Sequence, residues 1–291
     1  MKKVQPYIRL MRPHHYIKNL FIFLPLFFSG RMTERAFALR TLPGFLAFCL
    51  VSSMVYIYND IMDIESDRKH SVKCGRPLAS GAAKEKYARI LAGVLLCVSI
   101  ALQAAAGRAG PLSWLYLTAY LLINIAYSRR LKHVAVLDVA ILAAGFLLRL
   151  AYGAALTGIA VSGWLFLTVT AMSFYMGLGK RRGELIRQKE IRQVLISYNQ
   201  GFLEKSMNMC LTLTVAFYAL WAAENGRPAA GGFRSGGLLW TVPLVLLICL
   251  KYSLDLEGDS DGDPVEVVLH DKILCALALL LALIVSLLLY F

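Results

Sequence analysis

Apolar residues dominate this chain in long runs, and short charged segments separate one run from the next. A helix needs about 20 mostly apolar residues to cross the hydrocarbon core of a bilayer. Runs of this length predict membrane-spanning helices rather than the one-sided helices of a soluble protein. Pro25 lies in the first and shortest run, where it predicts a kink or a late start of the helix. We expect nine spans, at about residues 17–32, 41–61, 87–107, 111–128, 134–156, 162–180, 206–224, 237–254 and 272–291.

The composition supports the same interpretation. Hydrophobic residues make up 58% of the 291 residues and charged residues only 17%, whereas charged residues form about 25% of a typical soluble domain. These values exclude a soluble globular fold, a disordered chain and a coiled coil. The six cysteines show neither CxxC nor CxxxC spacing, so neither a zinc site nor disulfides are predicted. The predicted fold class is an all-α membrane protein formed by one domain over residues 1–291.

The charges are distributed by membrane side. With the N-terminus in the cytoplasm, 24 of the 31 Lys and Arg residues fall on the cytoplasmic side and six outside, while Arg149 lies within a span. This asymmetry orients the chain, and nine spans then place the C-terminus outside. The basic residues follow the membrane sides rather than a stripe of stacking aromatic residues, which excludes a nucleic-acid binder. Sixteen of the 18 acids also fall on the cytoplasmic side. Either a pocket for charged ligands or a solvated mixed-charge surface explains that excess.

Three aspartates follow the second predicted span in the segment NDIMDIESD. Asp60, Asp63 and Asp67 are spaced three, four and seven residues apart, which places them on one face of a helix. Like charges at this spacing repel one another, and a divalent cation removes the penalty. Mg²⁺ prefers carboxylate oxygens and completes its coordination with water and substrate phosphates. We therefore expect these aspartates to be catalytic and metal-binding, with Asn59 at the rim; a solvated helix end is the alternative.

A basic loop follows the aspartates directly. Arg68, Lys73 and Arg76 lie within ten residues of Asp67 in the segment DRKHSVKCGRPLASG. Carboxylates that hold a metal beside cations that hold phosphate oxygens are typical of a diphosphate site. We expect Lys73 and Arg76 to take part in catalysis. No Ser/His/Asp or Cys/His arrangement accompanies them.

These motifs together resemble the UbiA superfamily of intramembrane prenyltransferases. The resemblance lies in NDxxDxxxD at the end of the second span, KxxRPLASG after it, and the Arg-Pro pair of MRPHHYIKN before the first span. It implies a UbiA-like bundle of nine transmembrane helices with a polar pocket on the cytoplasmic side. It also implies Mg²⁺ as cofactor.

One departure narrows this resemblance to a branch of the family. Where UbiA prenyltransferases carry a second Asp-rich motif, this chain has GLGKRRGEL, with three cations and one acid. This segment, YSRRLKHVAVLD and GDPVEVVLHD are similar to the polyprenyl-phosphate phosphoribosyltransferases, of which the decaprenyl-phosphate enzymes are the best known. That branch implies phosphoribosyl pyrophosphate (PRPP) as donor, a polyprenyl phosphate in the bilayer as acceptor, and a product used for cell-envelope glycans. It further implies a bacterial inner-membrane enzyme.

The same segments supply the remaining candidate contacts to substrate. Arg149 would bind phosphate or form a structural pair inside its span. Tyr127 would line the site or anchor its helix at the membrane interface. The full set of expected substrate-binding residues is Lys18, Asn59, Tyr127, Lys132, Asp138, Arg149, Lys180, Arg181, Glu184 and Asp263.

Three functions compete at this stage. The first is Mg²⁺-dependent transfer of 5-phosphoribose from PRPP to a polyprenyl phosphate. The second is transfer of a polyprenyl group from its diphosphate to an aromatic acceptor, against which the missing second Asp-rich motif argues. The third is lipid binding or transport without chemistry, which would not require three aspartates on one helical face. No residue pattern predicts an oligomeric state.

Overall fold

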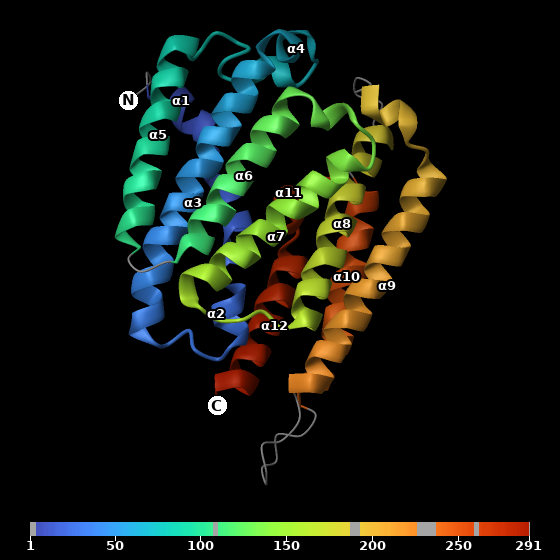
Figure 1. Ribbon diagram of the computed structural model, residues 1–291. Helices are drawn as coiled ribbons and strands as arrows, with labels where there is room; N and C mark the ends of the chain where they lie inside the picture. The colour runs from blue at the N-terminus through green and yellow to red at the C-terminus, as the bar shows by residue number, and fades with distance from the viewer. Residues whose placement is uncertain (1–3, 107–109, 187–192, 226–236, 259–261, 291) are drawn as a thin grey trace. The chain divides into compact units, whose positions relative to one another are not determined.

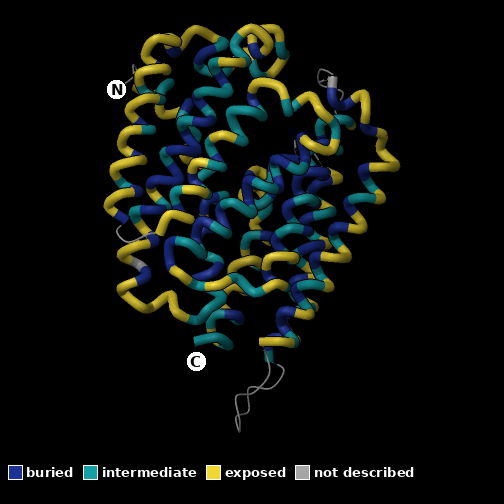
Figure 2. The backbone as a smooth tube through the Cα atoms, viewed as in Figure 1, coloured by how far each residue is buried: buried dark blue, intermediate teal, exposed yellow. Residues whose placement is uncertain are grey.

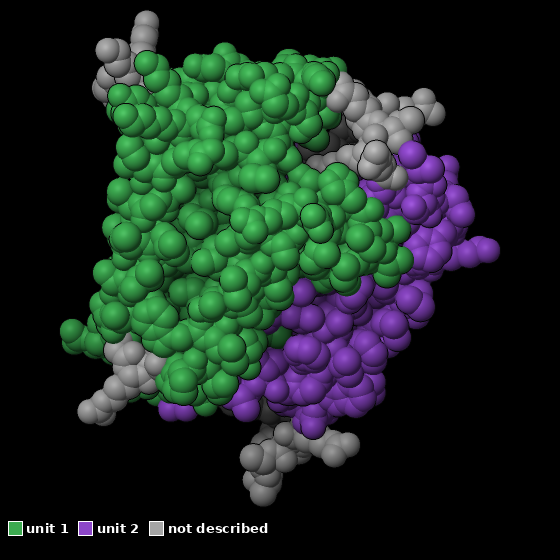
Figure 3. Space-filling model, turned by 45° about the horizontal axis from the view of Figure 1, so that its top comes forward, with its two compact units in different colours: residues 1–24, 34–141, 148–158 green, residues 25–33, 142–147, 159–291 purple. Residues whose placement is uncertain are grey.

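The computed structural model describes residues 4–106, 110–186, 193–225, 237–258 and 262–290. Every regular element among these residues is a helix, which confirms the predicted all-α fold (Figure 1). The contacts divide the chain into two compact units (Figure 3). Unit 1 comprises residues 1–24, 34–141 and 148–158, and unit 2 comprises residues 25–33, 142–147 and 159–291. The single domain expected from the sequence stays a prediction.

Unit 1 is built from six α-helices, one 11-residue 3-10 helix and two three-residue 3-10 helices among the residues described. Helix α6 begins at Pro111, whose missing N–H is not needed in the first helical turn. Helix α7 ends before Gly158, whose φ of 72° is the left-handed conformation that glycine readily adopts. The elements are α1 (Gln5–Met11), η1 (Pro13–Phe23), α3 (Arg35–Met62), α4 (Ile64–Lys69), η2 (Lys73–Gly75), α5 (Glu85–Ala105), α6 (Pro111–Arg129), η3 (Leu131–His133) and most of α7 (Leu137–Thr157).

Helix α3 is the centre of unit 1. It packs against α5 and α6, which lie beside it in Figure 1. Phe48 of α3 is fully buried and its ring lies 4.5 Å from that of Tyr120 and 5.2 Å from that of Tyr152. At Gly153 of α7 a side chain would collide with the carbonyl of Ile22, so glycine allows α7 and η1 to touch through their main chains. These contacts fix η1, α6 and α7 around α3.

A buried polar network crosses this apolar core. The guanidinium of Arg149, 5% exposed, donates from Nε to Oδ1 of Asn19 at 2.8 Å and from a terminal nitrogen to the hydroxyl of Tyr120 at 3.1 Å. It also lies over the rings of Tyr120 and Phe48, 4.8 and 5.1 Å from their centroids. Asn19 donates in turn to Sγ of Cys49 at 3.1 Å. A cation inside a membrane span is costly unless it is paired, and these contacts to η1, α3 and α6 offset that cost.

Unit 2 is built around α8 and α9, which pack along each other. Trp221 of α9 meets Phe28 edge to face at 4.8 Å. Lys251 pairs with Asp255 and with Asp271, just before α12. Hydrogen bonds from Lys251 and from the Leu274 backbone N–H lower the pKa of Asp271, so this carboxylate is charged at neutral pH. The elements are α2 (Leu24–Phe28), α8 (Gly163–Ile186), η4 (Gln193–Ser197), α9 (Gln200–Asn225), η5 (Gly237–Thr241), α10 (Val242–Glu257), α11 (Pro264–His270) and α12 (Lys272–Tyr290).

Six helical segments among the described residues are long and apolar enough to cross a membrane: Arg35–Met62, Glu85–Ala105, Leu137–Thr157, Gln200–Asn225, Gly237–Glu257 and Lys272–Tyr290. Large apolar side chains on them are exposed, for example Ile90, Val94 and Leu283, and exposed positions run along α5 in Figure 2. Such surfaces require lipid rather than water as their solvent. The expected first span is a 3-10 helix followed by the five-residue α2, which contains Pro25. The total of nine spans therefore stays a prediction.

The buried network of Arg149 yields a stability prediction. Replacing Asn19 by leucine removes the acceptor of the Arg149 Nε–H, and losing a buried hydrogen bond to a charged group costs about 1.5–3 kcal/mol. We expect Asn19→Leu to lower the thermal unfolding temperature of the detergent-purified protein. Asn208→Leu, at an exposed position of α9, is the matched control and should leave that temperature unchanged. Equal unfolding temperatures for both variants would contradict a stabilising role of the network.

Candidate functional site

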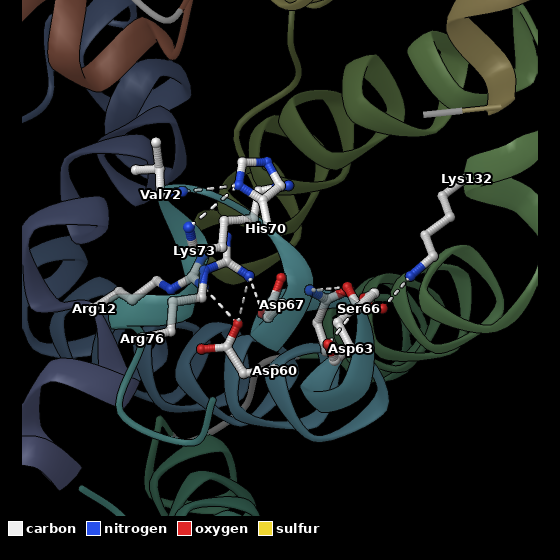
Figure 4. A network of polar contacts seen from close by, with 11 residues as sticks. Arg12, Asp60, Asp63, Ser66, Asp67, His70, Val72, Lys73, Arg76 and Lys132 are labelled. Atoms are coloured by element: carbon white, nitrogen blue, oxygen red, sulfur yellow. Dashed lines mark hydrogen bonds and ion pairs between the residues drawn. The ribbon is translucent and has the colours of Figure 1, made fainter. Parts of the chain in front are cut away.

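The three aspartates lie where α3 gives way to α4 in unit 1. Asp60 is in the last turn of α3, Asp67 is in α4, and Asp63 occupies the break between the two helices, with φ −100° and ψ 5°. Asp60 and Asp67 are buried, 2% and 4% exposed. The sequence predicts one helical face for all three carboxylates, but the break separates them. In Figure 4, Asp60 and Asp67 lie beside Arg76, while Asp63 is directed toward Lys132.

Two arginines neutralise Asp60. A terminal nitrogen of Arg12, which lies between α1 and η1, is 2.6 Å from Oδ1 of Asp60. A terminal nitrogen of Arg76 is 3.2 Å from the same oxygen and 2.8 Å from Oδ2 of Asp67 (Figure 4). Burying a carboxylate is costly without a partner, and these ion pairs supply it. The carboxylate oxygens of Asp60 and Asp67 thus converge on a single cationic nitrogen.

Asp63 forms the second pair of this cluster. Nζ of Lys132, in η3, is 2.5 Å from Oδ1 of Asp63, and Nδ2 of Asn59 donates to its Oδ2 at 3.1 Å. Both ion-paired side chains are partly open to solvent, with 17% of Lys132 and 19% of Asp63 exposed. The structure therefore brings together six residues that the sequence predicts for the site, and Arg12 joins them. We call Arg12, Asn59, Asp60, Asp63, Asp67, Arg76 and Lys132 the carboxylate cluster.

Two segments that contribute cations to the carboxylate cluster contain a residue with a strained backbone conformation. Among the described residues, two non-glycine residues have positive φ: Arg12, at 51°, and Val136, at 67°. Arg12 bears one cation of the cluster, and Val136 follows Lys132 by four residues. Such conformations persist only where the surroundings impose them, and they concentrate at functional sites.

The basic loop folds back on unit 1 after α4. Nδ1 of His70 accepts hydrogen bonds from the backbone N–H groups of Val72 and Lys73, at 3.1 and 3.3 Å, which shapes the turn before η2. Leu78 then enters the core cluster that contains Ile57 of α3. These contacts position the loop so that Arg76 lies beside Asp60 and Asp67. The catalytic role of Lys73 stays a prediction.

The predicted site residues of unit 2 form two further ion pairs. Lys180 Nζ lies 3.6 Å from Oδ2 of Asp263, and a terminal nitrogen of Arg181 lies 2.5 Å from Oε2 of Glu184. Arg181 is fully buried. Gly262 makes the first pair possible, because a side chain there would meet the Lys180 Cα at 2.8 Å. Asp263 also accepts from the backbone N–H of Val265 and so caps α11.

The remaining predicted residues lie elsewhere in unit 1. Lys18 is in η1 and Tyr127 in α6, both partly buried, and Asp138 is fully buried in the first turn of α7. Arg149 belongs to the core network described above. Their contact with a substrate stays a prediction.

The carboxylate cluster suits a divalent cation only in part. Among the residues described, no group of three or more His, Cys, Asp and Glu side chains is placed to hold a metal ion. Mg²⁺ needs fewer, since it is usually bound by one or two carboxylates together with substrate phosphates. One carboxylate oxygen of Asp60 and one of Asp67 contact the same terminal nitrogen of Arg76. This nitrogen occupies the position between the two carboxylates that a divalent cation would take. These two carboxylates meet the minimum that Mg²⁺ requires from the protein, and substrate phosphates and water would have to supply its other ligands.

Sequence reasoning missed Arg12 as a residue of this cluster. Its signal was the Arg-Pro pair before the first apolar run. The Arg-Pro pair marks this segment in the sequence. It does not show that the Arg12 guanidinium contacts Asp60, which lies 48 residues later in the chain.

Known proteins resemble this chain over most of its length. The model of the UbiA prenyltransferase family matches residues 22–256. A decaprenyl-phosphate phosphoribosyltransferase of Mycolicibacterium smegmatis is 33% identical, with 92% of this chain and 87% of the relative covered. The enzyme of that name from Corynebacterium glutamicum is 31% identical over 94% and 83%. The structure of a UbiA homologue from Archaeoglobus fulgidus bound to GPP and Mg²⁺ matches with a TM-score of 0.72 and 20% identity, covering 98% and 99%. The chain belongs to the UbiA prenyltransferase family.

Proposed function

We propose that this protein transfers 5-phosphoribose from PRPP to a polyprenyl phosphate of the decaprenyl type, releasing diphosphate. The observation that carries the proposal is the similarity to decaprenyl-phosphate phosphoribosyltransferases, at 31–33% identity over 92–94% of this chain. The product would be polyprenylphosphoryl-5-phosphoribose, a lipid-linked sugar phosphate suited to cell-envelope glycan synthesis.

The carboxylate cluster is the proposed site of the donor's diphosphate. Asp60 and Asp67 would hold Mg²⁺, which would supply positive charge to the diphosphate as it leaves. Asp63 is paired with Lys132, and its role as a third metal ligand stays a prediction from the sequence. Arg76 and Lys132 are already within ion-pair distance of these aspartates, so their cationic groups are close enough to share the phosphate oxygens. Guanidinium groups suit this task because their fork of N–H donors matches phosphate geometry.

The reaction needs no general base from the protein. The acceptor phosphate is already an anion near neutral pH and can attack C1 of the ribose directly. The protein's contribution is then to orient the two substrates and to stabilise charge in an oxocarbenium-like transition state. We expect the configuration at C1 to invert, because one displacement replaces the diphosphate.

The segment that replaces the second Asp-rich motif supports this donor over a prenyl diphosphate. Its one acid, Glu184, is paired with Arg181, so it offers no second carboxylate pair for a metal. The sequence predicts Lys180 and Arg181 as contacts for phosphate groups that Mg²⁺ does not neutralise; Lys180 is partly exposed, whereas Arg181 is fully buried and paired with Glu184. PRPP carries such a group at C5 of its ribose.

The proposed topology follows from the charge asymmetry of the loops. The distribution of Lys and Arg, 24 against 6, supports a cytoplasmic N-terminus, and nine spans would place the C-terminus outside. The carboxylate cluster follows the second span and would face the cytoplasm, where PRPP is available. The proposed location is the inner membrane of a bacterium.

A transfer assay tests the proposed function. Purified protein in liposomes with a short polyprenyl phosphate, Mg²⁺ and PRPP radiolabelled in its ribose should move label into the lipid phase, and EDTA should abolish the transfer. Asp60→Asn should lower the rate by at least about 100-fold, the loss typical when a group that stabilises transition-state charge is removed. Glu65→Gln is the matched control, since Glu65 lies in α4 between the aspartates but is 80% exposed, and it should retain activity. Full activity of Asp60→Asn would contradict the proposed site.

Donor choice separates the two enzymatic functions. We expect ribose transfer from PRPP and no prenyl transfer when a polyprenyl diphosphate and an aromatic acceptor are supplied instead. Mass spectrometry of the extracted lipids distinguishes the two products. A prenylated aromatic product without a phosphoribosyl lipid would overturn the proposal in favour of a prenyltransferase.

A further inference from the structure

Two guanidinium groups contact the Asp60 carboxylate, and together with Asp67 they balance its charge. Oδ1 of Asp60 accepts from Arg12 at 2.6 Å and from Arg76 at 3.2 Å, and Arg76 also binds Asp67. Two carboxylates and two guanidinium groups therefore form a neutral set. Lys132 and Asp63 form a second neutral pair beside it. Adding Mg²⁺ alone would leave this region with two uncompensated positive charges.

Several contacts hold Arg12 at Asp60. Oγ of Ser53, a fully buried residue of α3, donates to the carbonyl of Met11 at 2.7 Å and so fixes the chain directly before Arg12. The guanidinium of Arg12 lies 5.1 Å from the centre of the Tyr56 ring. Its backbone adopts φ 51° and ψ 58°, which a non-glycine residue rarely does and which the following proline disfavours further. A conformation of this kind persists only where surrounding contacts impose it.

Arg12 and Arg76 are nevertheless placed to exchange Asp60 for another anionic partner. The side chains of Arg12 and Arg76 are 20% and 26% exposed, whereas that of Asp60 is 2% exposed. The buried carboxylate therefore keeps its place while its partners border solvent. The arginine side chains, unlike that of Asp60, are therefore open in part to an anion that arrives from solvent.

We propose that Arg12 is a positioning residue that acts, with Arg76, as the built-in counter-cation of Asp60 when no metal is bound. The two guanidinium groups hold the carboxylate in place and compete with a divalent cation for it. They leave Asp60 only when a diphosphate offers its oxygens as replacement partners. Metal and diphosphate then bind together, and the metal alone binds weakly. This inference rests on the proposed function of the carboxylate cluster.

Metal affinity measured without turnover tests the inference. Mn²⁺ replaces Mg²⁺ as probe, and the electron paramagnetic resonance signal of free Mn²⁺ is followed during titration of the full chain in detergent, with and without inorganic diphosphate. We expect diphosphate to tighten Mn²⁺ binding to wild type. Arg12→Gln should tighten binding of Mn²⁺ alone by about tenfold, the scale on which residues that contact metal ligands change affinity. It should also reduce the gain from diphosphate.

Two further variants keep the outcome interpretable. Arg12→Lys retains the charge and should bind Mn²⁺ alone as weakly as wild type. Arg68→Gln removes an equal charge from α4, where Arg68 is exposed and pairs with Glu65, and should leave the affinity unchanged. Arg76 still compensates Asp60 in Arg12→Gln, so this variant should fold.

The outcomes separate the inference from the proposed function. If wild type binds Mn²⁺ with diphosphate but Arg12→Gln binds Mn²⁺ alone no more tightly than wild type, Arg12 does not compete with metal and the inference is wrong. An equal tightening in Arg68→Gln would likewise overturn it, because general charge would then be the cause. If wild type binds no Mn²⁺ even with diphosphate, the metal site of the proposed function fails as well.

Discussion

The burial of the Asp60 carboxylate is the constraint on which the rest of this site depends. A charged side chain that is 2% exposed at the end of a membrane-spanning helix must have cationic partners, and Arg12 and Arg76 both approach Oδ1 of Asp60. Each arginine comes from a different segment of unit 1. The turn before η1 and the loop after α4 are therefore both tied to the end of α3. The requirement to neutralise one carboxylate thus organises the polar end of unit 1.

The requirement that a buried charge has partners also applies to Arg149 in the core of unit 1, where different groups supply the contacts. Arg149 is buried in α7, where Asn19 and Tyr120 accept its N–H groups and aromatic rings flank it. Because a buried charge in the membrane is costly, each polar site has contacts from several segments of unit 1. The two sites differ in exposure. Arg149 is 5% exposed, whereas Arg12 and Arg76 border solvent, which is why we assign exchange of partners to the carboxylate cluster and a structural role to the core network.

The sequence predicts those features that depend on periodicity and spacing. Long apolar runs predict the helices of an all-α membrane protein. The spacing of the aspartates predicts that their carboxylates lie together, and Asp60 and Asp67 do so at Arg76. What it misses depends on contacts between distant segments. The break at Asp63 separates that carboxylate from the other two and directs it to Lys132, a partner 69 residues away. Arg12 reaches Asp60 from a segment in which Ser53 contacts the backbone and Tyr56 the guanidinium, and none of these contacts is local in sequence. Neither the 3-10 geometry of η1 nor the positive φ of Val136 has a signature in residue type.

The proposed function depends most on one contact, in which Asp60 and Asp67 hold a divalent cation against the diphosphate of the donor. Crystals grown with Mn²⁺ and PRPP test it directly when diffraction data are collected at the manganese absorption edge. We predict an anomalous peak beside the carboxylate oxygens of Asp60 and Asp67 and next to the diphosphate, with Arg12 and Arg76 moved onto phosphate oxygens. A peak at other acids, or bound PRPP with both arginines still on Asp60, would contradict the account.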